Sequence, residues 1–139
     1  MSEASEIPPQ PLPDEDSAGF WTATAEGHLA ICRCQGCRRW LHPPLECCPH
    51  CWDRTAYERV SGRGKLFSYI VVHQPAVPGY RDQVPYPVGL VELEEQLGLR
   101  LPGRLVGFAS QPPEIGCALQ AELEPLPGGD YHVAVFRPC

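Results

Sequence analysis

The sequence lacks long apolar runs, and none of its stretches approaches the roughly 20 consecutive apolar residues that a membrane-spanning helix needs. Its first sixteen residues carry neither the basic region nor the apolar core of a secretion signal. They are acidic and proline-rich instead, a composition that cannot bury enough apolar surface to fold. We therefore expect a cytoplasmic protein in which residues 1–16 form a disordered tail.

Familiar catalytic motifs are also missing. The chain contains no nucleophile elbow, phosphate loop or dinucleotide fingerprint, and its five histidines are scattered. His73 ends an apolar segment and opens a proline-containing loop, where a side chain can face a ligand, although a hydrogen-bonded histidine at a strand end is more common. The sequence thus favours a binding module over a self-sufficient enzyme.

Basic residues are scarce except in the middle of the chain. Residues 1–31 contain six acids and no Lys or Arg, whereas residues 32–65 contain seven bases against three acids, a local charge of +4. Among these bases are Arg38, Arg39, Arg63 and Lys65. A zinc ion with four thiolates carries a charge of about −2, which much of this basic surplus can neutralise.

Eight cysteines in 139 residues, without a secretion signal, favour metal binding over disulfides. Two C-x-x-C pairs, Cys34 with Cys37 and Cys48 with Cys51, are separated by ten residues. Each pair can present two thiolates from one tight turn, and together they complete a tetrahedral zinc site. Because four thiolates leave no open position for water, we expect the zinc to be structural.

Two further cysteines leave the ligand set open to alternatives. Cys32 can replace Cys34, and Cys47 can replace Cys48, but these spacings are awkward for chelating one ion, so we assign both as spare thiols. We expect Cys117, on the apolar face of a strand, and Cys139, at the last position, not to bind metal.

The remaining sequence predicts a short helix and a β-structure. Ser17 can cap a helix that Gly27 ends, with Phe20 and Trp21 on its apolar face. Turn residues and alternating hydrophobicity predict five strands, which suit a small closed barrel such as an OB-fold. These strands cover residues 66–73, 88–94, 97–106, 116–126 and 131–136, with a long loop holding Tyr80 and Tyr86 between the first two.

The order of these features resembles a known family. The residues that carry the resemblance are Phe20-Trp21, Gly27-His28-Leu29, Arg33 to Cys37, Trp40, Pro43-Pro44, Cys48 to Cys51, Val60 to Gly64, His73, Pro85-Tyr86-Pro87, Val88 to Leu93, Ile115-Gly116 and Phe136-Arg137-Pro138. The chain is similar over residues 18–138 to acyl-CoA-associated proteins with a rubredoxin-like zinc ribbon followed by an OB-fold. Trp52 departs from the pattern, since a glycine commonly follows the second cysteine pair.

The resemblance implies a mainly β fold with a short N-terminal helix, the zinc ribbon and a five-stranded barrel. We assign residues 1–16 to the tail, 17–31 to the N-terminal helix, 32–58 to the ribbon and 59–139 to the barrel. The resemblance also implies that the chain is a non-catalytic partner of a thiolase-like enzyme that acts on acyl-CoA thioesters. Such an enzyme is a lipid-transfer-type thiolase, an aldolase or an acyltransferase. Candidate contacts with CoA or the partner are Phe20, Trp21, Arg38, Arg39, Arg63, Lys65, His73, Tyr80 and Tyr86.

Three other functions remain open at this stage. The first is partnership with a MaoC-like enoyl-CoA hydratase, which the same family resemblance implies. The second is nucleic-acid binding, because zinc ribbons and OB-folds both serve it, although a pI near 5.3 disfavours it. A free-standing enzyme is the third.

Overall fold

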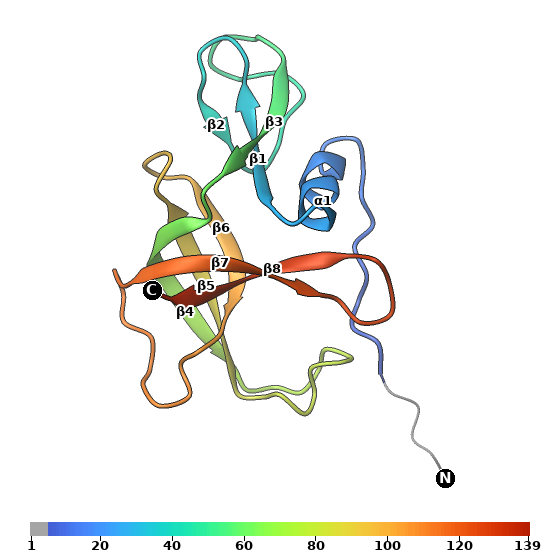
Figure 1. The fold of residues 1–139 in the computed structure, drawn as a ribbon, viewed down its shortest axis with the longest axis vertical. Coiled ribbons are helices and arrows are strands. Elements are labelled where there is room, and N and C mark those ends of the chain that lie inside the picture. Colours follow the sequence, from blue (N-terminus) through green and yellow to red (C-terminus); the bar gives the residue numbers. More distant parts are fainter. Residues whose placement is uncertain (1–5) are drawn as a thin grey trace.

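The computed structural model describes residues 6–139 and confirms a mainly β protein with one short N-terminal helix (Figure 1). No helix within this range is long and apolar enough to cross a membrane. The elements are α1 (Ala18–Ala25), β1 (Leu29–Cys34), β2 (Trp40–Leu41), β3 (Thr55–Val60), β4 (Arg63–Val72), β5 (Tyr86–Leu93), β6 (Arg100–Leu105), β7 (Ala118–Pro125) and β8 (His132–Pro138).

The last five strands close into a barrel in the order β4-β5-β6-β8-β7. All neighbouring pairs are antiparallel except β6 and β8, which are parallel, and this arrangement fits the predicted OB-fold. Each strand matches one of the five predicted segments to within a few residues. Leu119 on β7 is buried as its alternating pattern predicts, and Gly128 turns the chain into β8 with a φ of 92°.

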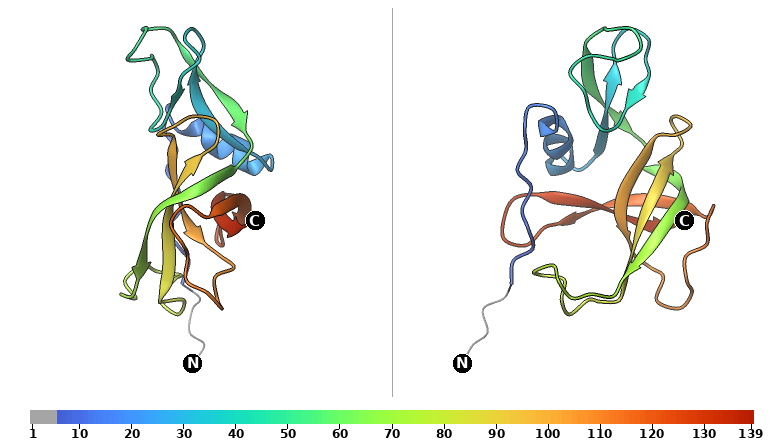
Figure 2. Two further views of the ribbon diagram at one scale, coloured as in Figure 1. Left: turned by 90° about the vertical axis from the view of Figure 1, so that its left-hand side faces the viewer. Right: turned by 180° about the vertical axis from the view of Figure 1, so that it is seen from behind.

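The first three strands form a separate antiparallel sheet in the order β2-β1-β3. This sheet and its two cysteine turns, residues 29–60, are called the ribbon below. The ribbon stands on one end of the barrel, and the loops over residues 73–85 and 106–117 lie at the opposite end (Figures 1 and 2).

One continuous core joins the base of the ribbon to the barrel. Leu29, Ile31, Trp40 and Val60 of the ribbon belong to the same buried cluster as barrel residues such as Phe136. The part of the ribbon farther from the barrel, which holds the two cysteine turns, is called the upper ribbon below. It has little apolar core of its own, since its buried cluster consists of Leu41 and three cysteines, with Tyr57 packed against it. The upper ribbon therefore needs another source of stability.

Helix α1 packs beside β1, but its start is not capped as the sequence predicted. Ser17 precedes the helix, but its hydroxyl accepts a hydrogen bond from the Asp14 N–H (3.1 Å) and caps no helical N–H. The Asp14 carboxylate accepts from the Ser17 N–H (2.8 Å), so the capping side chain lies one turn earlier than expected. At the other end Gly27 has a φ of 94° and His28 N–H reaches Ala23 O (3.1 Å), a glycine-based helix end as predicted.

A glycine inside α1 lets the helix approach the ribbon closely. A Cβ atom at Gly19 would overlap the ring of Tyr57 on β3. The Tyr57 hydroxyl donates to Asp16 O (2.6 Å), and burial raises the pKa of Tyr57 to about 12. Tyr57 thus fixes the start of the helix against the ribbon.

The predicted disordered tail lies partly outside the described residues, which begin at position 6. Residues 6–16 run past the turn between β7 and β8 (Figures 1 and 2) and make specific contacts there. Glu6 pairs with Arg81 (3.0 Å), and the Gln10 amide donates to Pro127 O (2.9 Å). Backbone and charged groups of distant loops thus contact residues 6–16, and the assignment of residues 1–16 as a disordered tail stays a prediction.

Candidate functional site

The four cysteines of the two C-x-x-C pairs converge at the tip of the ribbon. Their sulfur atoms all lie within 4.8 Å of one another, with Cys34 and Cys51 sulfurs 3.3 Å apart and Cys37 and Cys48 sulfurs 3.7 Å apart. A tetrahedral ion with metal–sulfur bonds of about 2.3 Å requires sulfur separations of about 3.8 Å. The cluster therefore has the size and the donor atoms of a four-thiolate metal site.

The two cysteine turns share one local geometry. The Gly36 and Cys37 N–H groups point at the Cys34 sulfur, and the His50 N–H points at the Cys48 sulfur, each at 3.4 Å. Such N–H groups stabilise thiolate charge and orient the ligand. In each turn the backbone is held in a conformation that directs both sulfurs to the same point.

The residue after each pair adopts a left-handed backbone conformation. Arg38 has a φ of 67° and Trp52 a φ of 65°, at equivalent positions of the two turns. A glycine would take this conformation without strain, which explains why glycine is expected where Trp52 stands. Trp52 is 80% exposed, so its side chain gains little from packing within this chain.

Charge within the cluster is distributed unevenly. Burial raises the pKa of the Cys34 thiol, but hydrogen bonds from Cys51 and from the N–H groups of Cys37 and Gly36 outweigh it and lower this pKa to about 6. The Arg39 N–H lowers the pKa of Cys37, whereas the neighbouring sulfurs and burial raise it to about 11. Four thiolates repel one another, and a divalent cation among them lowers the pKa of all four.

The other cysteines stand apart from this cluster. Cys32 is buried and its thiol donates to Leu45 O (3.5 Å), while Cys47 is exposed and its backbone bridges to Arg54. Cys117 lies against the barrel core and Cys139 is exposed. Neither Cys32 nor Cys47 joins the four-sulfur group within residues 6–139.

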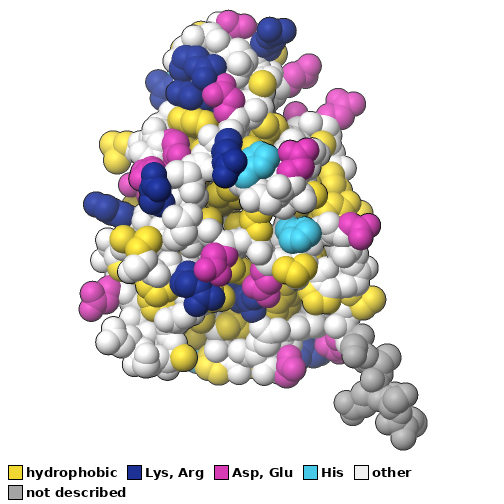
Figure 3. Space-filling view, in the orientation of Figure 1, with side chains coloured by type: hydrophobic (Ala, Val, Ile, Leu, Met, Phe, Trp, Pro, Cys, Tyr) yellow, Lys and Arg dark blue, Asp and Glu magenta, His cyan; other side chains and the backbone are white. Residues whose placement is uncertain are grey.

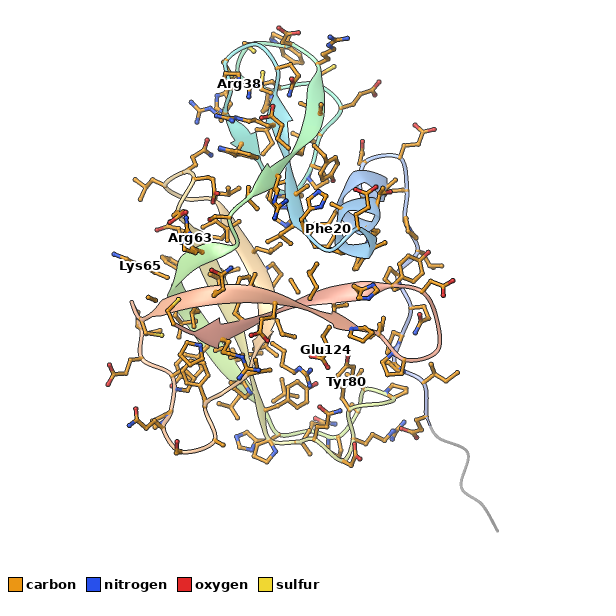
Figure 4. All side chains as sticks on the ribbon, in the orientation of Figure 1. Phe20, Arg38, Arg63, Lys65, Tyr80 and Glu124 are labelled. Atoms are coloured by element: carbon orange, nitrogen blue, oxygen red, sulfur yellow. The ribbon has the colours of Figure 1, made fainter. Side chains whose placement is uncertain are left out.

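The predicted basic contacts gather on the ribbon and the adjoining edge of the barrel (Figures 3 and 4). Arg38 pairs with Glu58 (2.7 Å), and Arg63 pairs with Glu94 (3.0 Å). Lys65 and Arg39 are exposed and form no ion pair within the described part of the chain. Part of the basic surplus is thus neutralised by local carboxylates, and part is free for a ligand or partner.

Arg38 contributes to a small network on the ribbon surface. Glu58 accepts hydrogen bonds from Gln35 (3.0 Å) and Arg38 (2.7 Å), which lower the pKa of its carboxyl group. Arg33 also pairs with Glu58 (3.4 Å) and lies over the ring of Trp40 (4.3 Å to its centroid). The network ties β1 to β3 just below the cysteine turns.

The predicted aromatic contacts form a second group, which lines a pocket on the barrel wall. Phe20 and Trp21 are in edge-to-face contact (ring centroids 5.0 Å apart), and Tyr80 and Tyr86 form a tilted pair (5.9 Å). Figure 4 shows Phe20 above and Tyr80 below this part of the barrel, away from Arg38, Arg63 and Lys65. The candidate contacts therefore fall into a basic group and an aromatic group, while His73 is exposed and lines no part of the pocket.

Several residues of the pocket escaped the sequence analysis. Arg104 on β6 and Glu124 on β7 form a two-pronged ion pair there (2.6 and 2.7 Å), and His42 of the ribbon reaches the pocket rim. The only available signal was Arg104 itself, a charged residue that follows Leu101, Pro102 and Gly103 on β6. Its partner comes from a strand that only the closed barrel brings near.

Comparisons with known proteins match both parts of the chain. The family model described as the ChsH2 rubredoxin-like zinc ribbon domain matches residues 21–58, and that of the ChsH2 C-terminal OB-fold domain matches residues 57–124. A DUF35 domain-containing scaffold protein of Methanocaldococcus jannaschii is 36% identical over 113 residues, which are 79% of this chain and 78% of that protein.

Two further relatives are similar over almost the whole chain. A probable enoyl-CoA hydratase alpha subunit of Thermomonospora curvata is 40% identical over 136 residues, which are 94% of this chain but 40% of the relative, so the chain spans about two fifths of that protein. A chain of the solved Ltp2-ChsH2(DUF35) aldolase superposes with a TM-score of 0.83 at 37% identity, covering 93% of this chain and 98% of that one.

Proposed function

Because the chain belongs to the DUF35 family and combines the ChsH2-type ribbon with its OB-fold, we propose that it is a scaffold subunit of a thiolase-like enzyme acting on acyl-CoA thioesters. In this proposal the subunit acts in the cytoplasm, and the larger enzyme supplies the chemistry. The solved Ltp2-ChsH2(DUF35) aldolase supports the proposal, since it names a ChsH2(DUF35) chain together with Ltp2. The archaeal relative named a scaffold protein supports the same role.

We infer that the ion held by Cys34, Cys37, Cys48 and Cys51 is zinc and that it is structural. All four donors are sulfurs at separations suited to a tetrahedral ion, and this filled set of ligands is the single observation that carries a non-catalytic role. When bound, zinc supplies the free energy that fixes the two cysteine turns to each other. The chain's own residues position the thiolates, and backbone N–H groups donate hydrogen bonds to them.

The surfaces we assign to partner or CoA binding are the two groups of candidate contacts. The basic group consists of Arg38, Arg39, Arg63 and Lys65, and the aromatic group consists of Phe20, Trp21, Tyr80 and Tyr86, with His73 at the end of β4. Guanidinium and ammonium groups attract CoA phosphates, and aromatic side chains are favoured at protein interfaces.

Co-purification tests the proposal. The tagged chain is co-expressed with a thiolase-like protein found encoded beside it, and the complex is assayed for cleavage or condensation of an acyl-CoA thioester. We expect a stable hetero-oligomer whose activity exceeds that of the larger subunit alone, with no turnover by the isolated zinc-loaded chain. No association, or turnover by the isolated chain, would contradict the assignment.

A MaoC-like enoyl-CoA hydratase is the second candidate partner, favoured by the relative named as a hydratase alpha subunit, of which this chain matches about two fifths. Parallel co-expression with a neighbouring hydratase and a hydration assay on an enoyl-CoA separate the two partners. Association with the hydratase alone would select the second candidate.

A further inference from the structure

The barrel wall carries a pocket of about 510 Å³ whose lining comes from four separate parts of the chain. Helix α1 covers one side, the loop over residues 73–85 covers another, and His42 of the ribbon reaches the rim, while β5, β6 and β8 form the floor. Its volume falls within the roughly 300–1,000 Å³ that is usual for small-molecule sites. The residues that line it are Ser17, Phe20, Trp21, His42, Val77, Tyr80, Tyr86, Val88, Leu101, Pro102, Gly103, Arg104, Val133, Ala134 and Val135.

The pocket presents no free charge. Arg104 is its one lining residue with a permanent charge, and the guanidinium is held by both oxygens of Glu124 (2.6 and 2.7 Å) and by the Gln83 side-chain oxygen (2.6 Å). It also lies 5.6 Å from the centroid of the Tyr80 ring. The arginine is therefore neutralised by its own chain and has few donors left for an anionic ligand.

The remaining polar groups do not change this balance. His42 reaches only the rim, where partial burial lowers the pKa of its imidazole. Phe20 and Trp21 of α1 and Tyr80 of the 73–85 loop contribute aromatic rings from two different sides of the pocket (Figure 4). Flat rings on both sides of an apolar floor suit a group of carbon rings or a branched chain.

We propose that this pocket binds the uncharged hydrocarbon part of a small molecule. The proposal goes beyond the scaffold role and concerns the chain alone. The absence of free charge favours a neutral hydrocarbon, because a charged group buried beside an already paired arginine would remain without compensation.

Two fluorescent probes with the same aromatic rings test the charge preference. N-phenyl-1-naphthylamine is neutral, whereas 8-anilinonaphthalene-1-sulfonate adds one sulfonate. Titration of the full zinc-loaded chain should show one saturable site for the neutral probe and binding at least about tenfold weaker for the sulfonate. Equal affinity for the two probes, or no saturable binding of the neutral one, would overturn the proposal.

Side-chain variants and methyl resonances locate the site. Val77 is 38% exposed in the loop, so Val77→Trp can fill the pocket without disturbing the barrel, and we expect it to weaken the neutral probe at least about tenfold. Leu97→Trp, at a 91% exposed position outside the pocket, is the matched control and should bind normally. In the unaltered chain the methyl resonances of Val88, Val133 and Val135 should shift with the same saturation curve, and their failure to do so would refute the assignment whether or not the variants fold.

A titration of the complex separates a ligand from a protein occupant. If the pocket serves a small molecule, the neutral probe still binds when the thiolase-like subunit is present. Exclusion of the probe from the complex would overturn the proposal, because the partner's own side chains would then fill the pocket. The result obtained with the isolated chain does not depend on whether any partner associates, so failure of the scaffold role leaves it intact.

Discussion

Replacing Cys34 with serine should remove stoichiometric zinc, whereas replacing Cys32, two residues earlier on the same strand, should not. Both side chains are buried, with 0% and 2% exposure, so the two changes disturb packing to a similar degree. Of these two residues, only Cys34 contributes its sulfur to the four-sulfur group. The pair of variants therefore separates metal ligation from burial.

The expected magnitudes follow from what stabilises the upper ribbon. Leu41 is the one aliphatic side chain in its buried cluster, and burying a leucine stabilises by about 2 kcal/mol. Binding of structural zinc contributes about 10–16 kcal/mol in comparable peptides, so the metal dominates. In Cys32→Ser the hydroxyl can still donate to Leu45 O, and we expect a loss of about 1 kcal/mol with full metal content.

Metal content by mass spectrometry and the absorption of the cobalt-substituted chain provide the assay. The unaltered chain and Cys32→Ser should bind about one ion per chain and show the visible bands of a four-thiolate cobalt site. Cys34→Ser should show a small fraction of the metal and weakened charge-transfer bands. Full zinc content in Cys34→Ser, or loss of zinc in Cys32→Ser, would refute the ligand assignment.

Three further predictions concern the ribbon and the basic surface. Trp52→Gly should raise the free energy of unfolding, measured in urea, by about 0.5 kcal/mol, because glycine adopts the left-handed conformation without strain, at the cost of some backbone entropy. A clear decrease in the free energy of unfolding would show that the tryptophan packs within the chain. Glu58→Gln should cost about 0.5 kcal/mol at pH 7. Because Gln35 and Arg38 lower the pKa of Glu58 in the folded state, this difference should shrink below pH 4.5 and vanish once the folded carboxyl is protonated, whereas a pH-independent difference would contradict this cause. Lys65→Glu should weaken association with the thiolase-like partner in a salt-dependent manner without changing the melting temperature, and unchanged affinity at low salt would exclude Lys65 from the interface.

The barrel and the cysteine cluster could be predicted because their signals are local. Alternation along residues 118–125 identifies a half-buried strand, and the C-x-x-C spacing selects the four sulfurs that converge in the structure. Each signal lies within a few neighbouring residues.

The pocket could not be predicted as a unit, because its walls come from segments far apart in the sequence. Trp21, Tyr80 and Ala134 meet only after the barrel has closed and α1 has packed beside it. The helix begins directly after Ser17 as predicted, but its capping side chain was misassigned, since Asp14 and Ser17 both have the chemistry of a capping residue. The role of Gly19 depends on Tyr57, a contact that no local pattern reveals.

The buried cluster shared by Leu29, Ile31 and Trp40 with the barrel makes the ribbon a rigid extension rather than a hinged module. A contact at Trp52 on the ribbon tip and a contact on the barrel therefore keep a fixed separation and orientation. Such a body can act as a spacer that holds two partner surfaces in register.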